Sequence, residues 1–236
     1  MFYADWTKHD FIEALPKGGV VAEIGVAKGD ISQDILAIAR PRKLHLIDPW
    51  RHQPVDDGGL DPNNVADAEQ EQRYRDVLAR FAGPIAAGTV EVHRATSQAV
   101  AGGFPDGTFD WIFVDGSHLY EHVLADLSLY APKLRPDGLF LGDDHVNADL
   151  HKRMRFGVVE AVRDFLRASR WHFSALARFG VFVLARDPHA PAHKAAMVEL
   201  LSRVDDFVEI RDPLARDLQS VGGTLPNGKK VFYWSF

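Results

Sequence analysis

The sequence contains no cysteine among its 236 residues. Disulfide bonds, thiolate nucleophiles and cysteine-ligated zinc are therefore excluded, and any metal site must be built from carboxylates and histidines. No apolar run approaches the roughly 20 residues that span a bilayer, and the first residues show no signal-peptide pattern. The formal net charge at pH 7 is -6, so the chain lacks the excess of basic residues that is typical of nucleic-acid-binding proteins. We therefore expect a cytoplasmic protein with a small-molecule ligand and neither nucleic acid nor membrane as partner.

Short apolar runs alternate with segments of helical periodicity along the chain. This alternation predicts an α/β fold of the Rossmann-like, doubly wound type, with a mainly parallel seven-stranded sheet and helices on both faces. The predicted strands are 20–25, 43–48, 89–93, 109–115, 139–142, 171–175 and 179–185. The predicted helices are 30–40, one ending near 81, 97–101, 120–134, 158–168 and 194–205.

Two segments stand outside this alternation. The polar stretch 51–72 predicts a long loop that leads into a helix, and such loops are often lids or binding loops, with surface decoration as the alternative. We expect residues 1–188 to form the main domain and 189–236 a helical and aromatic extension packed on the same domain. The aromatic terminus at 231–236 suits packing on the domain's own core or, alternatively, a homodimer interface.

A glycine-containing turn follows the first predicted strand, with Glu23, Gly25, Ala27 and Gly29 in the stretch EIGVAKG. A strand, a glycine turn and a helix together favour a nucleotide-like ligand. The spacing is not Gly-x-Gly-x-x-Gly, and Glu23 would repel a pyrophosphate, so a ligand with a positive charge suits the turn better. A generic strand-to-helix turn is the alternative.

Further polar residues end the next two strands. Asp48 is placed to accept both hydroxyls of a ribose, with capping of the following turn as the alternative. Ser97 and Gln98 can offer polar groups to a base ring, while Thr96 or Ser97 is also a good helix N-cap.

Three acids end the fourth and fifth predicted strands: Asp115, then Asp143 and Asp144. If these strands are neighbours, about 4.8 Å apart, the carboxylates converge and favour Mg²⁺, Mn²⁺ or Ca²⁺. Capping of loops and helices is the alternative. His118 and His145 follow these acids, and an imidazole at this place could act as a general base. His118 is the favoured base and His145 the second choice. His145 is also a candidate ligand of metal-bound water.

These motifs, in this order, resemble the class I S-adenosylmethionine-dependent methyltransferases. Within that class the chain is most similar to the metal-dependent O-methyltransferases that act on sugars of macrolide and aminocoumarin natural products. The matching stretches, within residues 18–186, are VAEIGVAKG from Val21, LIDP from Leu46, FVDGSHLY from Phe113, LRPDG from Leu134 and GDD from Gly142.

The resemblance implies roles for individual residues. The turn from Glu23 to Gly29, with Gly25 and Ala27, would hold the methionine end of the cofactor, with Glu23 near its ammonium. Asp48 would bind the ribose, and Ser97 or Gln98 would lie near the adenine. Asp115, also assigned to cofactor binding, would hold a divalent cation with Asp143 and Asp144, and His118 would be the base. Ala27 replaces the family's middle glycine, and the insert 56–67 and the tail after His189 have no counterpart and are expected to shape the substrate pocket.

The predicted function is S-adenosylmethionine-dependent methylation of a small-molecule hydroxyl, on a sugar, vicinal diol or catechol, with a divalent cation. Two alternatives remain open from the residues. One is an NAD-dependent oxidoreductase on the same type of sheet, which the absence of Gly-x-Gly-x-x-Gly disfavours. The other is a protein that binds S-adenosylmethionine without turnover.

Overall fold

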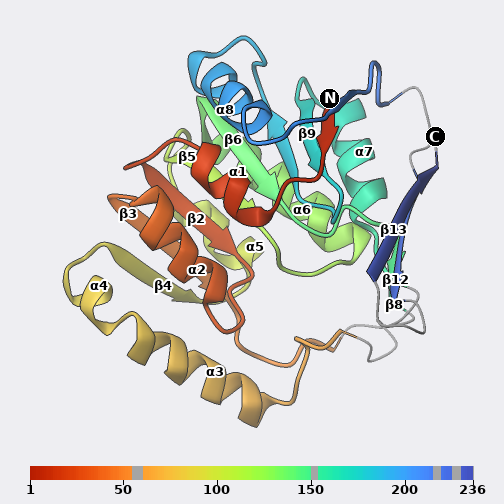
Figure 1. Ribbon diagram of the computed structural model, residues 1–236. Coiled ribbons are helices and arrows are strands. Elements are labelled where there is room, and N and C mark those ends of the chain that lie inside the picture. The colour runs from red at the N-terminus through yellow and green to blue at the C-terminus, as the bar shows by residue number, and fades with distance from the viewer. Residues whose placement is uncertain (55–60, 150–153, 215–218, 225–229, 236) are drawn as a thin grey trace.

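A central sheet dominates the computed structural model, which describes residues 1–54, 61–149, 154–214, 219–224 and 230–235 (Figure 1). In the described residues this sheet has nine strands in the order β11-β1-β9-β10-β6-β5-β2-β3-β4. Strands β4, β3, β2, β5 and β6 run parallel, whereas β10 runs antiparallel to both β6 and β9. The Rossmann-like, mainly parallel α/β fold predicted from the sequence is confirmed.

All seven predicted strands are present. They are β2 (Val20–Ile24), β3 (Lys43–Asp48), β4 (Val90–Arg94), β5 (Phe109–Val114), β6 (Leu134–Gly142), β9 (His172–Ala177) and β10 (Phe182–Ala185). The predicted number is too low because β1 (Phe2–Ala4) and β11 (Val208–Glu209) extend the sheet beyond β9. Strands of three and two residues are too short to show a period-2 pattern, so the sequence gives no signal for them.

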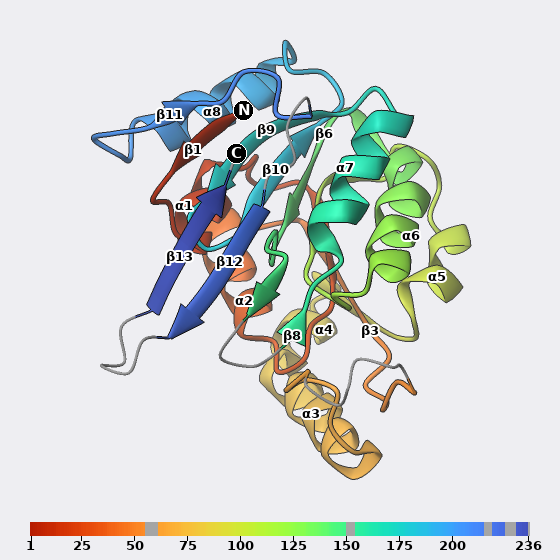
Figure 2. The same ribbon diagram turned by 90° about the vertical axis from the view of Figure 1, so that its right-hand side faces the viewer.

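Helices cover both faces of the sheet because their apolar residues recur every three or four positions. In α7, for example, Val158, Val162 and Phe165 are buried at this spacing. One face carries α1, α2, α3 and α8, and the other carries α5, α6 and α7, the last two side by side in Figure 2. The helices are α1 (Lys8–Ala14), α2 (Asp30–Asp34), α3 (Asp67–Arg80), α4 (Ala82–Ala86), α5 (Ser97–Val100), α6 (Tyr120–Tyr130), α7 (Val158–Ala168) and α8 (Pro191–Leu201).

A second, four-stranded sheet lies beside the main one and includes the C-terminal hairpin (Figure 2). Its strands are β7 (Ala148–Asp149), β8 (Met154–Arg155), β12 (Gln219–Thr224) and β13 (Lys230–Ser235). The predicted aromatic terminus forms β13, while Phe236 lies outside the described residues. The part of the predicted insert from 56 to 60 also lies outside them. Among the described residues, no helix has the length and apolar composition needed to cross a membrane.

Candidate active site

The turn between β2 and α2 has a left-handed backbone at Gly25 (φ 87°), Ala27 (φ 50°) and Gly29 (φ 78°). Gly25 cannot carry a side chain, because a Cβ there would lie 2.2 Å from the backbone oxygen of Asp115. The turn after β2 is therefore packed against the end of β5, which pairs with β2. Two parts of the predicted site, the glycine turn and Asp115, are adjacent.

Asp48 ties this turn to the end of β3. Its Oδ2 accepts hydrogen bonds from the backbone N–H groups of Val26 and Ala27, both at 2.9 Å. Its Oδ1 accepts the backbone N–H of Trp50 at 2.7 Å, and the indole of Trp50 donates to the Ala27 carbonyl at 2.9 Å. These bonds fix Ala27 in a conformation that usually favours glycine.

Glu23 lies behind the turn, in the interior. The Ser32 hydroxyl of α2 donates a short hydrogen bond to its carboxylate. Burial, followed by the nearby carboxylates of Asp115 and Asp48, raises the pKa of Glu23 well above its ordinary value. A positively charged ligand beside it would favour the ionised form.

One cavity lies at the carboxyl ends of β2, β3 and β5 and joins most of the predicted cofactor residues. Such an edge is where doubly wound sheets bind their ligands. The predicted residues that line it are Gly25, Ala27, Asp48, Ser97, Gln98, Asp115 and His118. Glu23, Gly29, Asp143, Asp144 and His145 do not line it, although Asp115 connects the cavity to the acidic cluster.

Asp126 of α6 also lines the cavity, and it is absent from the site residues predicted from the sequence. Asp126 is 3% exposed, receives a short hydrogen bond from the Ser97 hydroxyl, and lies 3.4 Å from the Gln98 amide nitrogen. Burial raises the pKa of Asp126 to about 7. The signal was in the sequence, because Val123, Asp126 and Tyr130 lie on one helix face where an apolar residue is expected at each position. Thr96, not Ser97, caps α5.

The three predicted acids converge at the ends of β5 and β6, which are neighbours as expected. Asp115, Asp143 and Asp144 each present a carboxylate oxygen, and these oxygens lie within 4.8 Å of one another. No sequence pattern indicates that a lysine from α1 also reaches this cluster. The Lys8 ammonium contacts Asp115 at 3.3 Å and forms a shorter ion pair with Asp143.

The charges in this cluster perturb one another strongly. Burial, then the neighbouring Asp143 carboxylate, raises the pKa of Asp115 to about 7. Burial alone would lower the pKa of Lys8, but the carboxylates of Asp115 and Asp143 outweigh burial and raise it. The acidic cluster thus carries excess negative charge and already attracts one cation from the chain itself.

The two predicted histidines have different environments. His118 lines the cavity, and its Nδ1 lies 3.3 Å from Oδ2 of Asp144, while its ring packs on Phe156 with centroids 4.9 Å apart. His145 is buried between the rings of Phe173 and Phe182, and burial lowers its pKa to about 4. The structure thus brings His118, and not His145, to the cavity.

The described part of the polar stretch 51–72 forms one wall of the cavity. Gln53 and Asn64 are joined by two hydrogen bonds of 2.8 and 2.9 Å, and the Gln70 amide donates to the Asn63 carbonyl at 2.8 Å. The residues of this stretch that line the cavity are Arg51, Gln53, Asp61, Asn63, Asn64 and Gln70. The described part of this stretch therefore borders the cavity, and its role in binding stays a prediction.

The family model described as a methyltransferase domain matches residues 22–145, more than half of the chain. The chain belongs to this methyltransferase family. The match spans the glycine turn, Asp48, most of the residues that line the cavity and all three acids, so the predicted membership of the class I S-adenosylmethionine-dependent methyltransferases is confirmed. A search of curated proteins returns no match.

Solved structures support the fold of the methyltransferase. A protein from Corynebacterium glutamicum is 15% identical with a TM-score of 0.53, over 79% of this chain and 83% of that one. A cofactor-bound protein from MTB is 18% identical with a TM-score of 0.51, over 78% of this chain and 82% of that one. These two likenesses show the Rossmann-like fold, whereas the family match identifies the chain as an enzyme. The closer resemblance to sugar methyltransferases stays a prediction.

Proposed function

We propose that the protein transfers a methyl group from S-adenosylmethionine to a hydroxyl oxygen of a small molecule, a sugar or a vicinal diol, and that a divalent cation assists. One observation carries this proposal: three carboxylates and His118 gather beside the cofactor cavity of a methyltransferase. Family membership supports methyl transfer over the alternative of an NAD-dependent oxidoreductase.

The cavity residues suit the parts of S-adenosylmethionine. Gly25 lines the cavity at the turn, where the methionine end would bind. The buried Glu23 lies behind the turn, and its carboxylate would attract the ammonium of the methionine end. Asp48 lines the cavity at the end of β3, where an acid can accept ribose hydroxyls. Ser97, Gln98 and Asp126 form a polar group suited to the adenine.

The acidic cluster suits a hard divalent cation, because its three carboxylates supply oxygen ligands of the type that Mg²⁺ and Mn²⁺ prefer. When bound, the cation would supply positive charge that lowers the pKa of the acceptor hydroxyl. The Lys8 ammonium contacts two of these carboxylates. We infer that Lys8 moves aside when the divalent cation binds.

His118 is the proposed general base. Its Nδ1 faces Asp144, which places the Nδ1 proton toward the carboxylate and leaves Nε2 to accept a proton from the acceptor hydroxyl. Asp144 thereby orients the imidazole, as well as offering an oxygen to the cation. The polar wall of Gln53, Asn63 and Asn64 would bind the remaining hydroxyls of the acceptor.

The test measures transfer of a labelled methyl group to catechol and hexopyranoside acceptors, with Mg²⁺ and with excess chelator. We expect turnover that the chelator abolishes and that Asp144→Asn lowers at least about tenfold, while calorimetry shows unchanged cofactor affinity. Asn is chosen because Asp144 has φ 56°, which asparagine tolerates. Asp106→Asn, at a distant and exposed ion pair, is the control. Full activity in excess chelator would contradict the role of the cation.

A further inference from the structure

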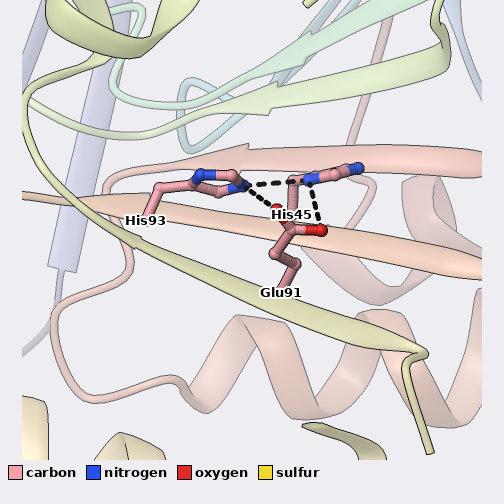
Figure 3. Close-up of side chains that lie close together, drawn as sticks. All are labelled: His45, Glu91 and His93. Carbon is pink, nitrogen blue, oxygen red and sulfur yellow. Dashed lines mark hydrogen bonds and ion pairs between the residues drawn. The ribbon is translucent and has the colours of Figure 1, made fainter. Parts of the chain in front are cut away.

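A second group of metal-ligating side chains lies on the main sheet, on strands β3 and β4. His45 is on β3, directly opposite Glu91 of the edge strand β4, and His93 follows Glu91 two residues later. Because side chains alternate along a strand, Glu91 and His93 point to the same face as His45. Figure 3 shows the three side chains turned toward one another. None of the three lines the active-site cavity.

The distances within this group are close to those around a tetrahedral metal ion. His45 Nδ1 lies 3.0 Å from His93 Nε2, and His93 Nε2 lies 3.7 Å from Glu91 Oε1. His45 Nδ1 lies 4.0 Å from Glu91 Oε2. Ligands at about 2.0–2.1 Å from zinc in tetrahedral geometry lie roughly 3.3 Å from one another. The two contacts of Glu91 involve different oxygens, and one ligand atom from each of the three residues lies within 4.8 Å of the others. Rotation of the exposed Glu91 carboxylate and shifts of somewhat under about 1 Å would bring one atom from each residue around a single ion.

Aromatic packing holds the two imidazoles in place before any ion binds. The His45 ring packs edge-on against Phe104 and Phe109, with centroids 5.2 and 5.6 Å apart, and the His93 ring packs against Phe104 at 5.4 Å. His45 is 8% exposed, whereas the Glu91 side chain is 49% exposed. The group is thus rigid on its inner side and open to solvent on its outer side, which leaves room for water as a fourth ligand.

The charges around the group also suit an ion. Lys43 is the charged neighbour, and its ammonium lies 2.7 Å from Glu91 Oε2 and donates to the Gly88 carbonyl at 3.2 Å. Glu91 therefore already holds one cation that a metal ion could replace.

We propose that His45, Glu91 and His93 bind a zinc-class transition-metal ion that fastens the edge strand β4 to β3. Imidazole nitrogen with one carboxylate favours Zn²⁺, Co²⁺ or Ni²⁺, whereas the all-carboxylate cluster at Asp115 favours Mg²⁺ or Mn²⁺. The two sites thus select different metals. The alternative role is a hydrogen bond between the two imidazoles with no ion.

Metal-free full-length protein is titrated with Zn²⁺ by calorimetry and with Co²⁺ by visible absorption. We expect one strong site per chain and the intense Co²⁺ bands of tetrahedral coordination. His93→Gln and Glu91→Gln, both at partly exposed side chains, should each weaken binding at least about tenfold. Lys43→Met should strengthen it, because a competing cation is removed. His189→Gln, at an exposed histidine, is the control.

Two further measurements separate this site from the acidic cluster. Asp144→Asn should leave the Zn²⁺ affinity unchanged, and Zn²⁺ should raise the melting temperature of wild type but not of His93→Gln. Zn²⁺ affinity that is equal in wild type, His93→Gln and Glu91→Gln would overturn the proposal, as would the absence of Zn²⁺ binding to wild type.

Discussion

Ala27 shows how a single residue can tolerate a conformation that favours glycine. Its φ is 50°, and Asp48 and Trp50 hold it there through hydrogen bonds to its N–H and its carbonyl. A left-handed backbone costs a non-glycine residue roughly 1–2 kcal/mol. The hydrogen bonds offset this cost, which explains why the turn keeps its shape without the family's middle glycine.

Ala27→Gly is therefore expected to raise the free energy of unfolding, by up to about 1 kcal/mol. The control is Ala79→Gly, at an exposed position in α3, which should lower it by about 0.5–1 kcal/mol. Urea denaturation measures both. A loss of stability in Ala27→Gly comparable to that in Ala79→Gly would contradict the strain at Ala27.

The raised pKa of Asp126 predicts that the free energy of unfolding depends on pH. Its pKa is raised from 3.8 to about 7 in the folded protein, so between these values the folded state binds a proton that the unfolded state has lost. The stability associated with the neutral carboxyl is fully present below about pH 4 and is lost as the pH rises through about 7. Each pH unit in this window lowers the free energy of unfolding by about 1.4 kcal/mol.

Asp126→Asn removes this titration and should keep the acceptor for the Ser97 hydroxyl. The unfolding free energy of the variant minus that of wild type should therefore increase by about 2 kcal/mol from pH 5 to pH 7. Urea denaturation at both pH values measures the difference. Parallel pH profiles for the two proteins would show that Asp126 is not protonated in the folded state.

At the scale of elements, α1 has an unusual first turn. Thr7 and Asp10 form a capping box, yet Lys8 occupies the first position, where the helix dipole disfavours a positive charge. The carboxylates of Asp115 and Asp143 compensate for this placement. Trp6 anchors the preceding chain by donating to the Leu200 carbonyl of α8 at 2.8 Å. The helix thus delivers an ammonium to the acidic cluster.

Lys8→Met should increase the affinity for Mn²⁺, because the variant removes a cation that competes for the same carboxylates. We expect roughly a tenfold gain, equivalent to about 1.4 kcal/mol. Calorimetry on wild type, Lys8→Met and the exposed control Lys194→Met measures the effect. Equal Mn²⁺ affinity in all three proteins would mean that Lys8 does not compete for the site.

At the scale of the whole molecule, the sequence predicted what depends on local pattern. Apolar runs that end in glycine or acid located the seven main strands, and the pairing of β5 with β6 brought Asp115 and Asp143 together as expected. Contacts between distant segments left no such pattern. Lys8 reaches Asp115 across 107 residues of sequence, and the three-residue strand β1 has no periodicity to detect. Asp126 was detectable, as an acid on an apolar helix face.

The central claim, that the three acids form a cation site of the methyltransferase, is tested most directly by anomalous diffraction from crystals grown with Mn²⁺ and S-adenosylhomocysteine. The account predicts one manganese peak among Asp115, Asp143 and Asp144, with the Lys8 ammonium displaced from Asp115 and Asp143. A map with no manganese peak there, and with Lys8 still paired to both carboxylates, would contradict it.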